Sequence, residues 1–100
     1  MATMLLASYE VADRDRFLTE FDAFEPGRAS AGGVTRGLLE TAGAGSRFVA
    51  LIEFPSRGDA QAFAGGAARR EALERASVID HTDEFLDVVR PSDAVAAPAA

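Results

Sequence analysis

Three side chains of this 100-residue chain could do chemistry on a small molecule, and the first is His81. It is the only histidine, and histidine is the side chain that normally changes charge between about pH 5 and 8. Asp80 and Asp83 flank it, and either could orient the imidazole ring. We therefore predict an acid–base role for His81. The alternative is a solvated histidine in an acidic turn between a helix and the last strand.

Tyr9 and Arg36 are the other two predicted catalytic residues. Tyr9 is the only tyrosine and shares one face of a predicted strand with Leu5 and Ala7, so its hydroxyl could donate to a substrate carbonyl or phenolate. The alternative is a core or interface tyrosine with a satisfied hydroxyl. Arg36 is expected on one strand face together with Val34, Leu38 and Glu40. Facing inward, Arg36 would bind an anionic or enolate oxygen. Facing outward, Arg36 and Glu40 would form an ordinary surface ion pair.

Other charged residues have bland interpretations beside functional ones. Glu53 interrupts an apolar strand. It could be a buried carboxylate that acts as a general base. The alternative is a carboxylate at the strand end that reaches solvent or an arginine. A second predicted helix carries six charged side chains, which we interpret as a solvated face with spaced ion pairs: Asp59, Arg69, Arg70, Glu71, Glu74 and Arg75.

Composition excludes several classes of protein. There is no cysteine, so disulfides, thiolate metal sites and a cysteine nucleophile are ruled out. A single histidine without a carboxylate cluster predicts no bound metal, and the glycine pairs lack the context of a phosphate-binding loop. The net charge of −6 argues against a nucleic-acid partner. No signal peptide or membrane-length apolar run is present, so we expect no membrane partner and a cytoplasmic location.

These residues must be positioned by a small number of elements. The expected strands cover residues 4–11, 34–41, 47–54 and 81–90, and the expected helices cover 14–24 and 59–76. Gly65 and Gly66 predict a break within the second helix, and residues 25–33 are expected to form a loop. Residues 1–90 are thus predicted to form one domain. Residues 91–100, rich in Ala, Pro and Ser, are predicted to be a disordered tail.

The order βαββαβ predicts an α+β, ferredoxin-like fold in which two helices cover one face of a four-stranded antiparallel sheet. The third strand has apolar side chains on both faces, with Phe48 and Ala50 on one side and Val49 and Leu51 on the other. A second apolar face needs a cover. We therefore expect a homodimer in which two sheets pair as a barrel.

The second helix predicts where a ligand could bind. Its apolar positions are mostly Ala and Gly, whereas the first helix presents Phe17, Phe21 and Phe24 on one stripe. The phenylalanine rings would hold the helix layer away from the sheet, and the small residues would leave a cleft. The alternative is close packing without a pocket.

One corner of the chain carries a family resemblance. Strand residues ending in Glu53-Phe54-Pro55-Ser56 lead into a helix with Ala60, Ala62 and Phe63, followed by the Ala- and Arg-rich stretch 67–75. This pattern resembles an uncharacterised bacterial family of the dimeric α+β barrel superfamily, which includes antibiotic-biosynthesis monooxygenases, muconolactone isomerases and small polyketide cyclases. The chain departs from its relatives at residues 64–67, where an aromatic-Ser-Pro-aromatic motif is common. It also lacks the Trp and Asn that accompany the His ligand in haem-degrading members.

The resemblance implies a cofactor-free enzyme that acts on an aromatic or polyketide-like molecule by proton transfer. The reaction would be a cyclisation, an isomerisation or a cofactor-independent monooxygenation. Tyr9 and Arg36 would hold substrate oxygens and His81 would be the acid–base group. The alternative is a non-catalytic dimeric module that binds a small molecule or serves as an accessory subunit. The absence of Lys, together with abundant Ala, Gly and Arg, is typical of a GC-rich bacterial genome.

Overall fold

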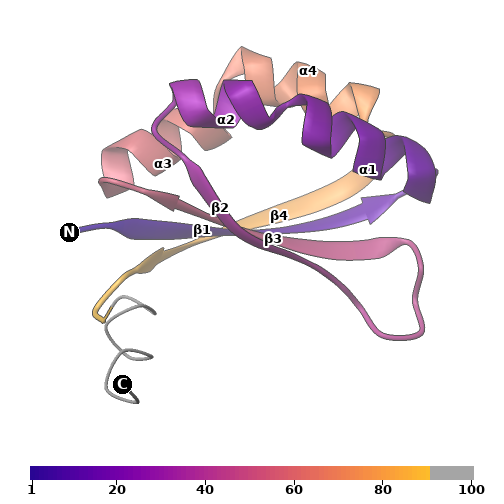
Figure 1. The fold of residues 1–100 in the computed structure, drawn as a ribbon, viewed down its shortest axis with the longest axis horizontal. Helices are drawn as coiled ribbons and strands as arrows, with labels where there is room; N and C mark the ends of the chain where they lie inside the picture. Colours follow the sequence, from indigo (N-terminus) through magenta and orange to yellow (C-terminus); the bar gives the residue numbers. More distant parts are fainter. Residues whose placement is uncertain (91–100) are drawn as a thin grey trace.

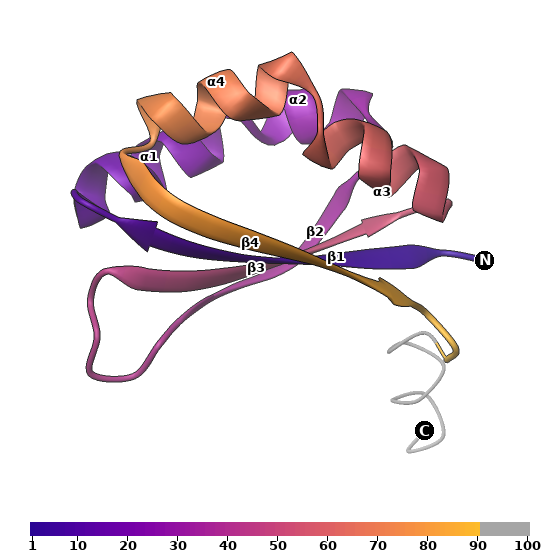
Figure 2. The ribbon, with the colours of Figure 1, turned by 180° about the vertical axis from the view of Figure 1, so that it is seen from behind.

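The computed structural model describes residues 1–90, so the predicted disordered tail lies outside the described residues. The elements follow the chain in the order β1 (Thr3–Val11), α1 (Arg14–Ala23), α2 (Glu25–Ser30), β2 (Val34–Glu40), β3 (Arg47–Phe54), α3 (Arg57–Ala64), α4 (Ala67–Arg75) and β4 (Val78–Asp87). Figure 1 shows a twisted sheet with all four helices on one of its faces, and Figure 2 shows the same layers from behind.

The sheet is antiparallel throughout, and its strands lie side by side in the order β2-β3-β1-β4. The two central strands are therefore the first and third of the chain, as a split-βαβ arrangement requires. The predicted α+β, ferredoxin-like fold is confirmed. The helix predicted over residues 59–76 consists of two helices, α3 and α4, and a further short helix, α2, lies in the segment predicted to be a loop.

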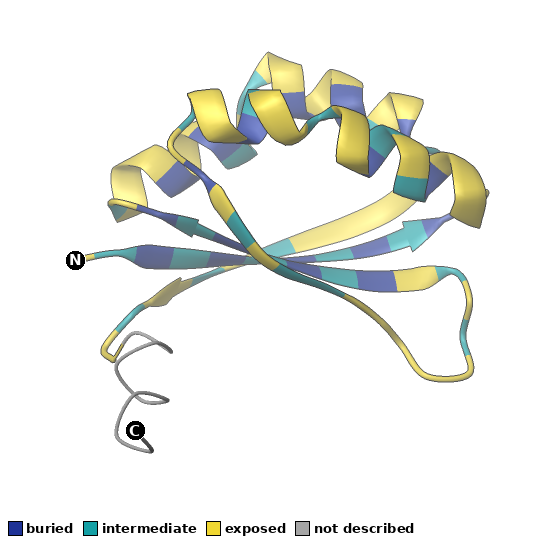
Figure 3. Ribbon diagram, viewed as in Figure 1, coloured by how far each residue is buried: buried dark blue, intermediate teal, exposed yellow. Residues whose placement is uncertain are grey.

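The core lies between the helices and the sheet. Along β1, buried and half-buried residues alternate from Thr3 to Val11, and β3 alternates in the same way (Figure 3). Strand side chains point to opposite faces in turn, so this alternation gives the two central strands one face that is buried under the helices. The buried side chains of the two central strands on that face are Thr3, Leu5, Ala7, Tyr9, Val11, Phe48, Ala50, Ile52 and Phe54.

The strand-to-helix corner after β3 forms as the sequence predicts. Pro55 follows the last strand residue, and the Ser56 hydroxyl accepts a hydrogen bond from the Asp59 backbone N–H at 3.1 Å. The α3 helix then ends at Gly65, and α4 starts after Gly66. The predicted break at the two glycines is confirmed.

The segment predicted to be a loop contains the short helix α2. Pro26 lies in its first turn, where a missing N–H costs no hydrogen bond. Gly27 has a packing role, because a Cβ built at this position would lie 2.4 Å from Cε1 of Phe24. The Phe24 ring therefore rests directly on the backbone of α2. The Pro-Gly pair thus starts a second helix instead of ending the first one.

The last strand begins and ends three residues earlier than predicted. Ser77 has a positive φ of 60° and turns the chain, after which Val78 pairs with Val11. His81 consequently lies within β4, directly opposite Tyr9, and not in a connecting turn.

The prediction that Arg36 shares one strand face with Val34, Leu38 and Glu40 is wrong, because the pairing of β2 with β3 shifts between Thr35 and Gly37. Leu38 lies opposite Ala50 on the covered face, whereas Val34 lies opposite Glu53 on the open face. An extra residue in one strand turns the following side chains to the other face. Arg36 is the extra residue, so the four residues Val34, Arg36, Leu38 and Glu40 do not share one face as a regular alternation would require.

Within residues 1–90, no helix is both long enough and apolar enough to cross a membrane.

Candidate functional site

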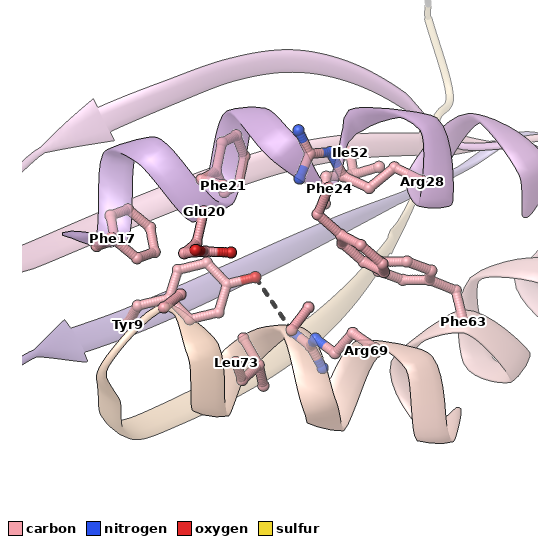
Figure 4. A pocket seen from close by; sticks show the side chains of 12 residues that line it. Tyr9, Phe17, Glu20, Phe21, Phe24, Arg28, Ile52, Phe63, Arg69 and Leu73 are labelled. Carbon is pink, nitrogen blue, oxygen red and sulfur yellow. Dashed lines mark hydrogen bonds between the residues drawn. The ribbon is translucent and has the colours of Figure 1, made fainter. Parts of the chain in front are cut away.

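A small aromatic cavity lies between the helices and the sheet, where the sequence predicts a cleft (Figure 4). Its volume is about 30 Å³, which is room for about two water molecules. Side chains from all four helices and both central strands line it: Tyr9, Phe17, Glu20, Phe21, Phe24, Arg28, Ile52, Phe63, Arg69, Ala72, Leu73 and Ala76. The aromatic stripe of α1 forms one wall, and the small residues of α4 form part of the opposite wall.

Packed rings fix the position of Tyr9 in this wall. The Phe17 ring stacks on Phe48 with centroids 4.6 Å apart and lies 5.5 Å from the Tyr9 ring. Such aromatic pairs contribute about 0.5–1.5 kcal/mol beyond the burial of their surface. Tyr9, on β1, is thus held against α1, and its hydroxyl is directed toward α4 (Figure 4).

Arg69 of α4 is one of two deeply buried arginines at the cavity, with only 3% of its surface exposed. Its two terminal nitrogens, Nη1 and Nη2, each donate to an oxygen of the Asp83 carboxylate at 2.6 Å. Nη2 also donates to the Tyr9 hydroxyl at 3.3 Å, and Nη1 donates to the Ala64 carbonyl at 3.3 Å. A two-pronged guanidinium–carboxylate pair fixes direction as well as distance. Asp83 of β4 therefore orients Arg69 toward Tyr9.

The guanidinium of Arg69 stays charged although it is buried. Burial alone lowers its pKa, but the hydrogen bonds that Arg69 donates to Asp83 and to the Tyr9 hydroxyl, together with the charge of Asp83, raise that pKa above its ordinary value. The Nε–H of Arg69 has no hydrogen-bond partner within residues 1–90. A buried donor left without an acceptor costs about 1–3 kcal/mol. An oxygen atom of a ligand would remove this cost.

The Tyr9 hydroxyl has a free donor as well. It accepts from Arg69, and within the described residues its own hydrogen has no acceptor. A tyrosine hydroxyl both accepts and donates. Two donors without an acceptor, Tyr9 Oη–H and Arg69 Nε–H, thus belong to residues that line the same cavity.

Glu20 of α1 supplies a carboxylate to the cavity wall. Figure 4 shows it beside the Tyr9 ring, and its side chain is 33% exposed. Among the described residues, its ion-pair partner is Arg75, whose Nε lies 3.8 Å from Glu20 Oε2. A carboxylate at the mouth of an apolar pocket can accept a proton from a bound molecule.

A second arginine, Arg28 of α2, is also buried at the cavity. Its guanidinium lies 3.9 Å from the centre of the Phe21 ring and donates to Glu25 at 2.7 Å and to Thr35 at 3.0 Å. These partners tie α2 to α1 and to the edge strand β2. Arg28 thus closes one end of the cavity and adds positive charge to it.

The structure brings one of the three predicted catalytic residues into this cavity, namely Tyr9. Arg36 instead donates to Glu53 at 3.1 Å, and its side chain is 45% exposed on the open side of the sheet. His81 is 42% exposed, and its Nε2 lies 4.0 Å from Asp83 Oδ2. His81 lines a groove with Gly65, Gly66 and Arg70, and this groove shares Arg69 and Leu73 with the cavity. A further hollow is lined by both Tyr9 and His81, without Arg36. Tyr9, Arg36 and His81 therefore do not converge on one point.

Sequence reasoning missed Arg69 and Asp83, and placed Arg69 on a solvated helix face. The signal in the sequence is helical spacing, since Arg69, Ala72 and Ala76 lie at positions i, i+3 and i+7. That spacing puts Arg69 on the buried face of α4. Among the described residues, no group of three His, Asp or Glu side chains could hold a metal ion.

Comparison with solved structures finds the same fold in other proteins. A candidate antibiotic biosynthesis monooxygenase from Bordetella bronchiseptica is 14% identical with a TM-score of 0.75, covering 89% of this chain and 98% of its own. SnoaB from Streptomyces nogalater, a cofactor-independent oxygenase, is 10% identical with a TM-score of 0.74, covering 90% and 95%. A NIPSNAP domain protein from Burkholderia xenovorans is 13% identical with a TM-score of 0.62, covering 89% and 98%.

No protein-family model matches the chain, and no curated protein matches its sequence. The structural likeness spans nearly the whole length of both chains. It agrees with the fold that the resemblance at the Glu53–Ser56 corner implies. At these low identities it establishes the architecture and leaves the chemistry to the site itself. The protein therefore has the fold of the antibiotic biosynthesis monooxygenases.

Proposed function

We propose that this protein is a cofactor-independent enzyme that acts on an aromatic or polyketide-like small molecule by proton transfer in the helix–sheet cavity. The observation that carries the proposal is the pair of free donors, Tyr9 Oη–H and Arg69 Nε–H, at the wall of an aromatic cavity. Donors fixed in a low-dielectric site stabilise an oxygen on which negative charge develops. Such an oxygen forms when a ketone or phenol loses a proton to become an enolate or phenolate.

The groups at the cavity divide the work of such a step. Tyr9 and Arg69 hold the substrate oxygen, so Arg69 takes the role first predicted for Arg36. The Glu20 carboxylate is placed to remove a proton from carbon, whereas His81 lies outside the cavity. A role for His81 as the acid–base group stays a prediction to be tested beside Glu20.

Among the possible reactions, oxygenation has specific support from SnoaB, a cofactor-independent oxygenase with this fold. Anthrone is a suitable test compound because its CH₂ group loses a proton to give an electron-rich enolate. This enolate reacts with O₂, and the balanced overall reaction converts anthrone and O₂ into anthraquinone and water. Cyclisation or isomerisation would begin with the same proton removal.

The proposal is tested by following O₂ uptake and anthraquinone formation with the purified protein. We expect equal amounts of O₂ consumed and quinone formed, at a rate above that of buffer. Tyr9→Phe removes one donor and keeps the ring, and we expect it to lower kcat/KM roughly 10²-fold. Binding of anthrone without turnover would support the alternative of a non-catalytic binding module.

We also propose that the working form is a homodimer joined through the open face of the sheet. That face carries partly exposed apolar side chains on all four strands: Met4, Leu6, Val34, Leu39, Val49, Leu51 and Leu86. A contiguous apolar face of this kind is a frequent protein–protein contact site. Neither face of the sheet would then be left to solvent.

A further inference from the structure

A surface groove lies next to the inner cavity, on the other side of the stacked Phe24 and Phe63 rings. This groove has a volume of about 280 Å³ and lies between α2 and the α3–α4 junction. Phe24, Phe63 and Arg69 line both this groove and the inner cavity. The two phenylalanine rings are stacked with centroids 6.1 Å apart and an interplanar angle of 27°. They form the partition between the two spaces.

Neither space alone suits an aromatic ligand that reaches both donors. The inner cavity, at about 30 Å³, is far below the roughly 150 Å³ that admits a benzene molecule in an apolar cavity. The groove is large enough for a ring but opens to solvent on α2. Together the two spaces reach the lower end of small-ligand pockets, about 300 Å³.

We propose that the inner cavity and the groove are one ligand site, and that Phe24 and Phe63 are its specificity-determining residues. They set the length of the planar, anionic aromatic molecule that the site accepts. This inference rests on the proposed function for the location of the site and adds the class of ligand. A long ligand enters by displacing the Phe24 ring from Phe63 and stacks on the fixed Phe63 ring in its place.

Charge fixes which end of the ligand enters first. The inner cavity is lined by two arginines, Arg28 and Arg69, against one carboxylate, Glu20, and the Nε–H of Arg69 has no acceptor within residues 1–90, so this end favours an anionic oxygen. Asp59, at the outer part of the groove, disfavours negative charge there. The carboxylate or phenolate end of the ligand is therefore directed inward and the apolar end outward.

Small residues make room for the moving rings. Gly27, Ala31, Ala62 and Gly66 line the groove, and the Phe24 ring rests on the backbone of Gly27. Phe24 is only half-buried, so it can swing outward at less cost than Phe63, which also packs on Phe54 at 5.3 Å. Phe24 is thus the movable ring and Phe63 the fixed one.

The test uses benzoate, 2-naphthoate and anthracene-2-carboxylate, which share a carboxylate and differ in the number of rings. Separating the ring pair costs about 0.5–1.5 kcal/mol, so removing it by Phe24→Ala should tighten binding of the three-ring probe roughly two- to tenfold. We expect benzoate, which fits the groove alone, to bind within about twofold of wild type. Bound anthracene-2-carboxylate should show NMR contacts to both Ile52, in the inner cavity, and Ala62, in the groove.

Gly27→Ala provides a second variant that removes no atom. Its Cβ forces the Phe24 ring from its place, so the preference for three rings over one should change by about threefold or more. Gly58→Ala is the matched control, because its Cβ meets only Ser56 Oγ at 3.8 Å, and we expect it to leave the preference unchanged.

Three results separate this inference from the proposed function. Contacts of the long probe to only one of Ile52 and Ala62, or an unchanged ring preference in both Phe24→Ala and Gly27→Ala, would overturn the joined site. Turnover of anthrone by the wild type in that case would keep the enzyme and would require the inner cavity itself to open, because three rings do not fit its volume of about 30 Å³. A probe that spans both spaces in a protein without turnover would overturn the enzyme and keep the joined site.

Discussion

The buried charge of Arg69 depends on a single carboxylate. The Asp83 carboxylate accepts hydrogen bonds from both terminal nitrogens of Arg69. The Asp83 side chain is 18% exposed, so the pair lies at the edge of the helix–sheet layer. A buried pair of this kind adds little to stability by itself, but losing one partner leaves a charge in an apolar site. The same contact that orients Arg69 for a ligand therefore makes the fold sensitive to Asp83.

Asp83→Asn should lower the free energy of unfolding by roughly 3 kcal/mol or more, because it leaves the Arg69 guanidinium buried without a counter-charge. Urea unfolding followed by circular dichroism measures the change. Asp80→Asn, on an exposed position of the same strand, is the control and should stay within about 0.5 kcal/mol of wild type. Equal stabilities of the two variants would show that Arg69 does not need Asp83.

A comparison of Glu20→Gln with His81→Gln distinguishes the two candidate acid–base residues. We expect Glu20→Gln to lower kcat for anthrone oxidation by about 10²-fold or more, since the carboxylate is the proton acceptor at the cavity. His81→Gln should leave kcat nearly unchanged and keep the shape of the pH–rate profile. The opposite pattern would return the acid–base role to His81.

At the scale of elements, two glycines that follow helices differ in backbone conformation. Gly65, which ends α3, has an ordinary φ of −90°, and an added Cβ would meet Gln61 O at 3.5 Å. Gly32, which follows α2, has a φ of +88°, and its Cβ would lie 3.3 Å from Pro55 Cδ. One glycine is thus replaceable and the other is required by the chain path.

Gly65→Ala should raise the free energy of unfolding by about 0.4–1 kcal/mol, because alanine restricts the unfolded chain without straining the folded one. Gly32→Ala should lower it by about 1 kcal/mol or more, since alanine is strained at a positive φ. Thermal unfolding of both variants beside wild type measures these shifts. A gain for Gly32→Ala would contradict the left-handed turn after α2.

The start of α1 is tied to the end of β2 by an exposed ion pair. Arg14 Nε donates to Glu40 at 2.8 Å, and this hydrogen bond lowers the pKa of the Glu40 carboxyl below its ordinary value of 4.5. A carboxyl whose pKa is lowered by folding stabilises the folded state above its ordinary pKa, and that contribution is lost as the pH falls through the lowered value.

Glu40→Gln should therefore lower Tm slightly at neutral pH and not at all in strong acid. The difference should also shrink in high salt, because the pair is exposed to solvent. Calorimetry of both proteins across the acid range measures the effect. A Tm difference that grows toward low pH would contradict the assigned sign.

At the scale of the whole molecule, the fold was predictable because strand alternation leaves two choices of face and the element order leaves few topologies. The alternation of Leu5, Ala7 and Tyr9 correctly predicts the covered face of β1. The extra residue at Arg36 has no such periodic signal. Arg69 was missed because arginine is rarely buried unless paired, and its partner Asp83 lies on a different element.

The open sheet face leads to a prediction for the assembled molecule. At micromolar concentration, light scattering should give twice the 10.5 kDa mass of one chain. Leu51→Lys places a charge at the centre of that face and should shift the mass to one chain, since an unpaired buried charge opposes association. Gln61→Lys, on an exposed position of α3, is the control and should remain dimeric. A monomeric wild type would rule the dimer out.

The position of Tyr9 also gives the protein an intrinsic fluorescence signal that reports on its interior. The chain has no Trp and no second Tyr, so its ultraviolet emission comes from one phenol, the one that contacts Arg69 beside the cavity. Emission changes can therefore be assigned to that position without attaching a dye. The same native signal can follow refolding and titration with non-absorbing compounds, and each experiment reports on the group expected to meet the substrate.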